Sequence, residues 1–175
     1  MLKNKRILSL FFIFSLIIPS LSFADAAEGD IIVTLGEDLK ENEKQKLLEE
    51  MKAPENAQVV VVTNEEEHKY LGQYIPKATI GTRALSSSAI TIGAPGSGLE
   101  IETNNITSIT DDMFTNALIT AGVKDASIYI TAPIPVSGTA ALTGIIKAYE
   151  LSSDQAIPED VKQIANEEMV KTVEL

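Results

Sequence analysis

The sequence predicts an α/β or α+β fold, in which helices pack on the faces of a mixed β-sheet that carries an inserted β-hairpin. Three observations lead to this prediction. Runs of β-branched residues alternate along the chain with segments of helical periodicity. Polar residues of the type that cap helices follow most of these runs directly. Two β-type runs, Arg83–Gly93 and Leu99–Asn105, are joined by a Pro/Gly loop, which is typical of a hairpin.

The first half of the chain contains two predicted strand–helix pairs. Ile31–Leu35 is a short apolar strand, and Glu41–Met51 has the apolar spacing of a helix. Gln58–Thr63 contains four consecutive valines, which predicts a central strand covered on both faces. Asn64 is expected to cap the next helix, with Glu67 completing a capping box.

The second half begins with the predicted hairpin. Its second run, Leu99–Asn105, alternates apolar with polar residues, so one face should meet water. Thr110 is expected to cap a helix over Asp111–Ala121. The remaining predicted elements are a strand over Ala126–Thr131, a helix over Ser137–Glu150 and a C-terminal helix from about residue 157.

The N-terminus has the layout of a secretory signal peptide. Met1–Arg6 carries three basic residues and no acid, and Ile7–Ile18 is uncharged and mostly apolar. Small residues at Ser22 and Ala24 predict cleavage near Ala24. The alternative is a membrane anchor, but 12 residues span only about 18 Å of a hydrocarbon core about 30 Å thick. We therefore expect a signal peptide over 1–24 and one domain over 25–175, secreted, extracellular or wall-associated and not stably inserted in the membrane.

The charge of the expected mature chain limits its partners. All 25 acidic residues but only 11 of the 14 basic ones follow Ala24, so the formal net charge there is −14. Such a field repels nucleic acids and anionic lipids, and it suits solubility or a cationic partner. The chain has no cysteine, so its stability must come from packing.

The turn at Pro135–Thr139 precedes a helix and could offer backbone N–H groups to an anion. A phosphate loop would need a lysine and then a serine or threonine directly after its last glycine, and no lysine directly follows Gly138; the Gly-x-Ser-x-Gly pattern of a serine nucleophile is absent too. The only histidine, His68, is predicted on a surface helix. These absences favour a helix cap over a catalytic turn, and no catalytic residue is assigned.

Four residues are nevertheless candidates for ligand binding. Ser137, Gly138 and Thr139 form the turn, although a cap at Ser137 and packing roles for Gly138 and Gly144 are the simpler interpretation. Arg83 is the only arginine after the signal peptide, and arginine forms paired hydrogen bonds with carboxylates and phosphates. It should bind either a carboxylate of this chain, which we favour, or an anionic ligand.

Neither a metal nor a cofactor is predicted. Glu65, Glu66, Glu67 and His68 are adjacent on a helix, so their side chains point in different directions and do not converge on one ion. The HExxH, His-x-His and cysteine-pair patterns of metal sites are absent.

One pattern recurs at the ends of four predicted strands. If these strands are parallel, their following helices begin at one edge of the sheet, where open α/β sheets bind ligands. Ordinary strand–helix connections also need polar caps, which is the simpler explanation. The four junctions are Ile31–Asp38, Val59–Asn64, Ile106–Asp111 and Ile128–Ser137.

Three sets of segments carry a family resemblance: Val61–Gly72, Ile80–Ser87, and Asn105–Thr107 with Asn116–Val123 and Pro135–Gly144. Together they resemble the YpuA-like family of exported Gram-positive bacterial proteins, a domain family of unknown function, over roughly residues 31–175. The resemblance implies export and a longer helical C-terminal region than this chain has. It implies no activity, cofactor or catalytic residue.

These observations predict a non-enzymatic cell-envelope or extracellular binding module. Its partner would be an envelope protein, a peptide or a wall component. The alternative is an enzyme of unrecognised type that acts on an anionic envelope substrate, with Arg83 holding the substrate.

Overall fold

The computed structural model describes residues 27–153 and 156–171. The predicted signal peptide over 1–24 lies outside these residues. Within the described ranges, no helix combines the length and the apolar character that a membrane crossing requires.

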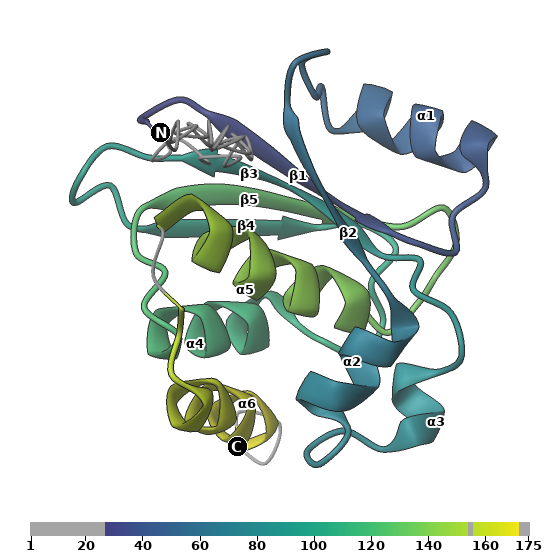
Figure 1. Ribbon diagram of the computed structural model, residues 1–175, viewed down its shortest axis with the longest axis vertical. Helices are drawn as coiled ribbons and strands as arrows, with labels where there is room; N and C mark the ends of the chain where they lie inside the picture. Colours follow the sequence, from purple (N-terminus) through teal and green to yellow (C-terminus); the bar gives the residue numbers. More distant parts are fainter. Residues whose placement is uncertain (1–26, 154–155, 172–175) are drawn as a thin grey trace, which may run out of the picture.

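A mixed sheet of five strands forms the centre of the molecule, with the strand order β2-β1-β3-β5-β4 (Figure 1). Only β3 is antiparallel to its neighbours, so β1, β2, β4 and β5 all run in the same direction. This confirms the predicted mixed sheet of the α/β class. The strands are β1 (Ile31–Gly36), β2 (Gln58–Val62), β3 (Ser87–Ile92), β4 (Leu99–Thr103) and β5 (Ala126–Thr131).

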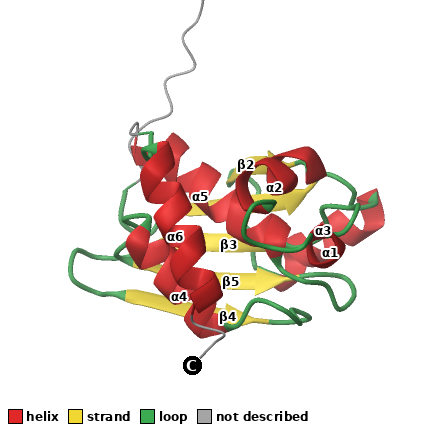
Figure 2. Ribbon diagram, turned by 90° about the horizontal axis from the view of Figure 1, so that it is seen from below, coloured by secondary structure: helices red, strands yellow, loops and turns green. Residues whose placement is uncertain are grey.

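The described helices cover the two faces of the sheet unequally. α1 lies alone on one face, whereas α4 and α5 pack on the other and α6 packs outside α4 (Figures 1 and 2). The short α3 lies in a segment for which no helix is predicted from the sequence. The helices are α1 (Glu41–Glu50), α2 (Asn64–Leu71), α3 (Lys77–Ile80), α4 (Asp111–Thr120), α5 (Thr139–Ser153) and α6 (Glu159–Lys171).

The larger core lies between the sheet and α4 and α5, and it contains the fully buried Phe114, Leu118 and Ile130. A smaller core under α1 contains Leu47 and Met51. α5 approaches the sheet closely at Gly144. A Cβ there would lie 2.8 Å from Thr34 Cβ and 2.9 Å from Val62 Cγ2, which confirms the predicted packing role of this glycine.

The prediction of a central strand over Gln58–Thr63 is wrong, because β2 is an edge strand. Its valines alternate between buried and exposed positions. Val60 and Val62 are buried against α5, whereas Val59 and Val61 are each 48% exposed on the side of α1. Consecutive valines therefore do not require a strand that is covered on both faces, since here one face of the strand stays partly exposed.

The predicted hairpin is not formed as a pair of neighbouring strands. The chain does reverse direction between β3 and β4, but β5 lies between them and pairs with both. The cap of α2 is also displaced by one residue. Thr63, not Asn64, is the N-cap, and Glu66, not Glu67, completes the capping box.

Candidate functional site at the carboxyl ends of the parallel strands

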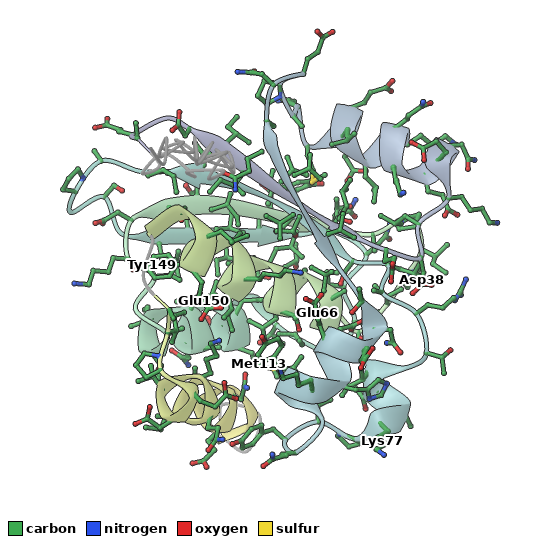
Figure 3. All side chains as sticks on the ribbon, viewed as in Figure 1. Asp38, Glu66, Lys77, Met113, Tyr149 and Glu150 are labelled. Carbon is green, nitrogen blue, oxygen red and sulfur yellow. The ribbon has the colours of Figure 1, made fainter. Side chains whose placement is uncertain are left out.

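The four parallel strands all end at the same edge of the sheet, and α2, α4 and α5 begin there. The sequence pattern of strands that lead into polar caps therefore has the geometry expected of an open α/β sheet. Asp38 and Glu66 lie at this end of the molecule, whereas Tyr149 lies at the opposite end of α5 (Figure 3). We call this edge the strand-end site.

The turn at Ser137–Thr139 enters this site and is held by a tight contact at Gly138. Gly138 has a φ of +98°, which L side chains rarely adopt. A Cβ there would lie 2.7 Å from Ile106 Cγ2 and 3.3 Å from Phe114 Cζ. Gly138 therefore allows the loop before α4 to pack against the start of α5, as predicted.

A chain of hydrogen bonds runs from this turn to a buried carboxyl group. The Thr139 hydroxyl donates to Glu67 Oε2 at 2.5 Å, and the Ser137 and Thr139 hydroxyl oxygens are 3.0 Å apart. Since the Thr139 proton points at Glu67, the Ser137 hydroxyl is the donor to Thr139. Asn64 Nδ2 donates to the other oxygen, Glu67 Oε1, at 3.2 Å. The side chain of Glu67 is only 1% exposed.

Burial raises the pKa of Glu67 above its ordinary value of 4.5. The hydrogen bonds from Thr139 and Asn64 and the proximity of His68 act in the opposite direction, and the charge of Asp38 adds to the increase. The net effect is a raised pKa. The strand-end site thus holds a carboxyl group that ionises less readily than a surface glutamate.

His68 serves to hold the neighbouring loop. Its Nε2 atom lies 2.8 Å from the carbonyl oxygen of Gly81, and because a carbonyl only accepts, Nε2 carries the proton. Asn64 Nδ2 approaches the same carbonyl at 3.5 Å. No group of three or more acidic, histidine or cysteine side chains within 27–153 and 156–171 could hold a metal ion.

Arg83 lies at this edge with its side chain exposed. Its neighbour Ala84 is buried and packs with Val62 and Ala140, which places the backbone of this segment beside the start of α5. The backbone N–H of Ala84, and not the guanidinium, binds the carboxylate of Asp38, at 2.7 Å. Arg83 forms no ion pair with the described residues. The expected carboxylate partner of Arg83 is therefore not found in that part of the chain.

Of the four predicted site residues, the structure joins Ser137, Gly138 and Thr139 in one turn and places Arg83 on the adjoining segment. The place of Glu67 in this site is not predicted from the sequence. Its one sequence signal is its spacing from Leu71, four residues later, because both side chains are buried on the inner face of α2.

A second polar cluster lies on the opposite face of the sheet, under α1. Glu50 Oε1 accepts hydrogen bonds from Tyr129, Thr131 and Asn104, at 2.8 to 2.9 Å. Partial burial acts to raise the pKa of Glu50, but the three hydrogen bonds outweigh it and lower the pKa below 4.5. This carboxylate connects α1 to β5 and to the end of β4.

Comparison with known proteins shows the family. Residues 35–175 match the model of a family described as "Protein of unknown function (DUF1002)". The chain belongs to this family. A relative from Bacillus subtilis (strain 168), "Uncharacterized protein YpuA", is 66% identical over 160 residues, which make up 91% of this chain and 55% of the relative. The chain thus spans about half the length of that relative, and the resemblance to the YpuA-like family is confirmed. No solved structure matches.

Proposed function

We propose that the protein is an exported, non-enzymatic binding module of the cell envelope, secreted or associated with the wall. The basic, apolar and small-residue segments of 1–24 support export, because this order is that of a cleaved leader. The charge of −14 after Ala24 supports a role away from nucleic acids and anionic lipids.

The observation that carries the binding role is the exposed guanidinium of Arg83 at the strand-end site. It is the only arginine of residues 25–175, and no described carboxylate neutralises it although acidic residues are abundant. Arginine binds carboxylates and phosphates through paired hydrogen bonds. The ligand contacts Arg83 through an anionic group of a wall component, peptide or protein, beside the turn at Ser137–Thr139.

Thermal unfolding of protein purified from cells that express the full 175-residue chain tests this role. The probes are soluble fragments of a Gram-positive cell wall and a glycerol-phosphate polymer. A probe at about 100 times its Kd adds about 2.7 kcal/mol to the free energy of unfolding, which raises the midpoint by several degrees. The mass of the same protein, when recovered from outside the cells, tests the leader, because cleavage after Ala24 leaves Asp25 first.

Two variants make the test specific. Arg83→Ala should abolish the shift, and Lys77→Ala, which removes another exposed cation from the preceding segment, should preserve it. An equal loss in both variants would indicate general charge attraction. No shift with either probe would contradict the binding role proposed for the strand-end site.

The second candidate function is an enzyme, and the chain of hydrogen bonds from Ser137 through Thr139 to Glu67 favours it. In that case the ionised form of Glu67 would take the proton of Ser137 through Thr139 while Ser137 Oγ bonds to the carbonyl carbon of an ester or amide in an anionic substrate held by Arg83. The bond to the alcohol or amine would break, and Glu67 would pass the proton to that leaving group. A fluorophosphonate that modifies nucleophilic serines separates the two candidates. Labelling of Ser137 that is lost in Glu67→Gln would favour the enzyme, and an unlabelled Ser137 would favour the binding module.

A further inference from the structure

The outer edge of β2 offers backbone groups that no other strand takes up. β2 ends the sheet, and Val62 faces β1, since its carbonyl accepts from the N–H of Glu37 at 2.8 Å. Successive residues of a strand direct their backbone groups to opposite sides, so the groups of Val59 and Val61 point outward. The outward carbonyl of Val61 accepts from Lys147 Nζ at 2.8 Å, which confirms this orientation.

Side chains of the described residues form hydrogen bonds with the outward backbone groups at the carboxyl end of β2 but not with those at its amino end. Lys147, bound to Val61, also forms an ion pair with Glu66 at 2.6 Å, and Glu66 accepts from the backbone N–H of Thr63. In the described part of the chain, no hydrogen bond occupies the N–H and carbonyl of Val59 or the N–H of Val61. Natural proteins usually protect such an edge along its length, because it can pair with another strand.

A groove runs beside the open end of the edge. It has a volume of about 630 Å³ and lies between β2 and the flank of α1, with Leu48, Ala53, Ala57 and Val59 among its lining residues. Val59 and Val61, each 48% exposed, are on the same side of the sheet. A strand added at β2 would therefore direct every second side chain toward this groove.

We propose that the β2 edge and the groove beside α1 form a docking site for an extended peptide segment of a partner protein, in which apolar residues alternate with basic ones. The unpaired backbone groups of Val59 and Val61 require an extended backbone. The apolar groove accepts the alternate apolar side chains, and its rim carries Glu49 and Glu55 against a single Lys52, which favours a cationic partner.

A second copy of this chain fits the edge less well. Two copies paired through β2 would bring their Glu49 and Glu55 side chains toward one another, and each copy carries a net charge of −14 after Ala24. The docking site is separate from Arg83 and the turn at Ser137–Thr139. The binding role proposed for the strand-end site and this docking site can therefore fail independently.

Fluorescence anisotropy with a labelled hexapeptide of alternating lysine and valine tests the proposal. The protein is purified from cells that express the full chain. We expect saturable binding that Val61→Pro weakens by about tenfold or more, because proline removes the outward N–H and leaves the bonds to β1 intact. Val59→Thr should weaken binding several-fold by removing apolar contact while retaining a β-branched side chain. Ile134→Thr, at an isoleucine that is 49% exposed outside any strand, should have no effect.

Peptide controls keep the test decisive if Val61→Pro fails to fold. A peptide N-methylated at alternate residues should not bind, and neither should one with glutamate in place of lysine. The proposal is overturned if the peptide does not bind, if the N-methylated peptide binds equally well, or if Val59→Thr and Ile134→Thr behave alike. It is also overturned if sedimentation shows a dimer that Val61→Pro dissociates, because the edge would then join two copies of this chain.

Discussion

At the scale of single residues, Glu67 gives the fold an unusual dependence on pH. Its pKa is raised in the folded protein, since burial disfavours the charged form. The group therefore supports the folded state fully below 4.5, its ordinary value in an unfolded chain, and this support is lost as the pH rises through the raised pKa. Most acidic groups, which are hydrogen-bonded or paired, behave in the opposite way.

We expect Glu67→Gln to become more stable relative to the natural protein as the pH rises from about 4 to about 8. Glutamine stays neutral, its oxygen still accepts from Asn64, and its amide can donate to the Thr139 hydroxyl. Denaturant unfolding at several pH values measures the difference. Thr139→Val is the control, because it leaves a buried carboxyl oxygen without its donor and should cost about 1 to 3 kcal/mol. A difference between Glu67→Gln and the natural protein that is independent of pH would contradict the raised pKa.

The position of Glu67 could not be predicted from the sequence, for a reason that the cap of α2 makes clear. Thr63 and Asn64 are both good N-cap residues of similar preference. A helix rotates by about 100° per residue, so moving the cap by one residue exchanges which glutamate reaches back to the cap and which turns inward. The burial of Leu71 and the contact with Thr139 determine that Glu67 is the glutamate that turns inward, and both depend on the tertiary structure. The packing of Gly138 and Gly144 was predictable, because small residues in a turn and an apolar helix have few other roles.

At the scale of secondary-structure elements, the carboxylate of Glu50 adds hydrogen bonds to the apolar packing that holds α1 on the sheet. Glu50 binds β5 through Tyr129 and Thr131 and reaches the end of β4 through Asn104. Because its pKa is lowered in the folded protein, Glu50 contributes stability above 4.5 that is lost as the pH falls through the lowered pKa. The carboxyl groups on the two faces of the sheet therefore have opposite effects.

Glu50→Gln should destabilise the protein at neutral pH, and this effect should fade as the pH falls below about 4. The amide nitrogen cannot accept hydrogen bonds, and the neutral oxygen is a weaker acceptor for three donors. Thermal unfolding at several pH values measures the effect. Glu49→Gln, the neighbouring position on α1, provides a matched loss of charge. If both variants behave alike, the effect belongs to net charge and not to the three hydrogen bonds.

Element types could be predicted from the sequence more reliably than element neighbours. The cap of α4 at Thr110 and the alternation in β4 are local features, and both are found, with the glutamates of β4 exposed. The loop between β3 and β4 reverses the chain as predicted, but β5, from later in the chain, pairs between them. Local sequence does not encode such a nonlocal insertion. The valines of β2 led to the wrong prediction of a central strand for a similar reason. Apolar residues on both faces of a strand also occur where a groove or partner covers one face.

At the scale of the whole molecule, a local sequence pattern accounts for the arrangement of the parallel strands but not for the distribution of charge. The repeated passage from β-branched residues to polar caps implied an edge where helices begin together if the strands were parallel, and the four strands are parallel. Charge follows no such periodicity. The described residues form three ion pairs, so most of the acidic groups in that part of the chain lack a paired cation. Repulsion among them therefore outweighs attraction, and it opposes compaction.

Added salt should consequently stabilise the protein at neutral pH. Raising NaCl from about 0.01 M to about 0.5 M shortens the Debye length from about 30 Å to a few ångström, which screens repulsion between exposed carboxylates. We expect the midpoint in scanning calorimetry to rise by several degrees at about pH 8. The rise should disappear as the pH falls to the pI, where the net charge vanishes; the pI is about 4.5 for the full 175-residue sequence and lower for a chain without its three N-terminal basic residues. This pH serves as the control condition. A midpoint that falls with salt at neutral pH would mean that ion pairs such as Lys162–Glu150 and Lys147–Glu66 stabilise the fold more than the excess of acidic charge opposes it.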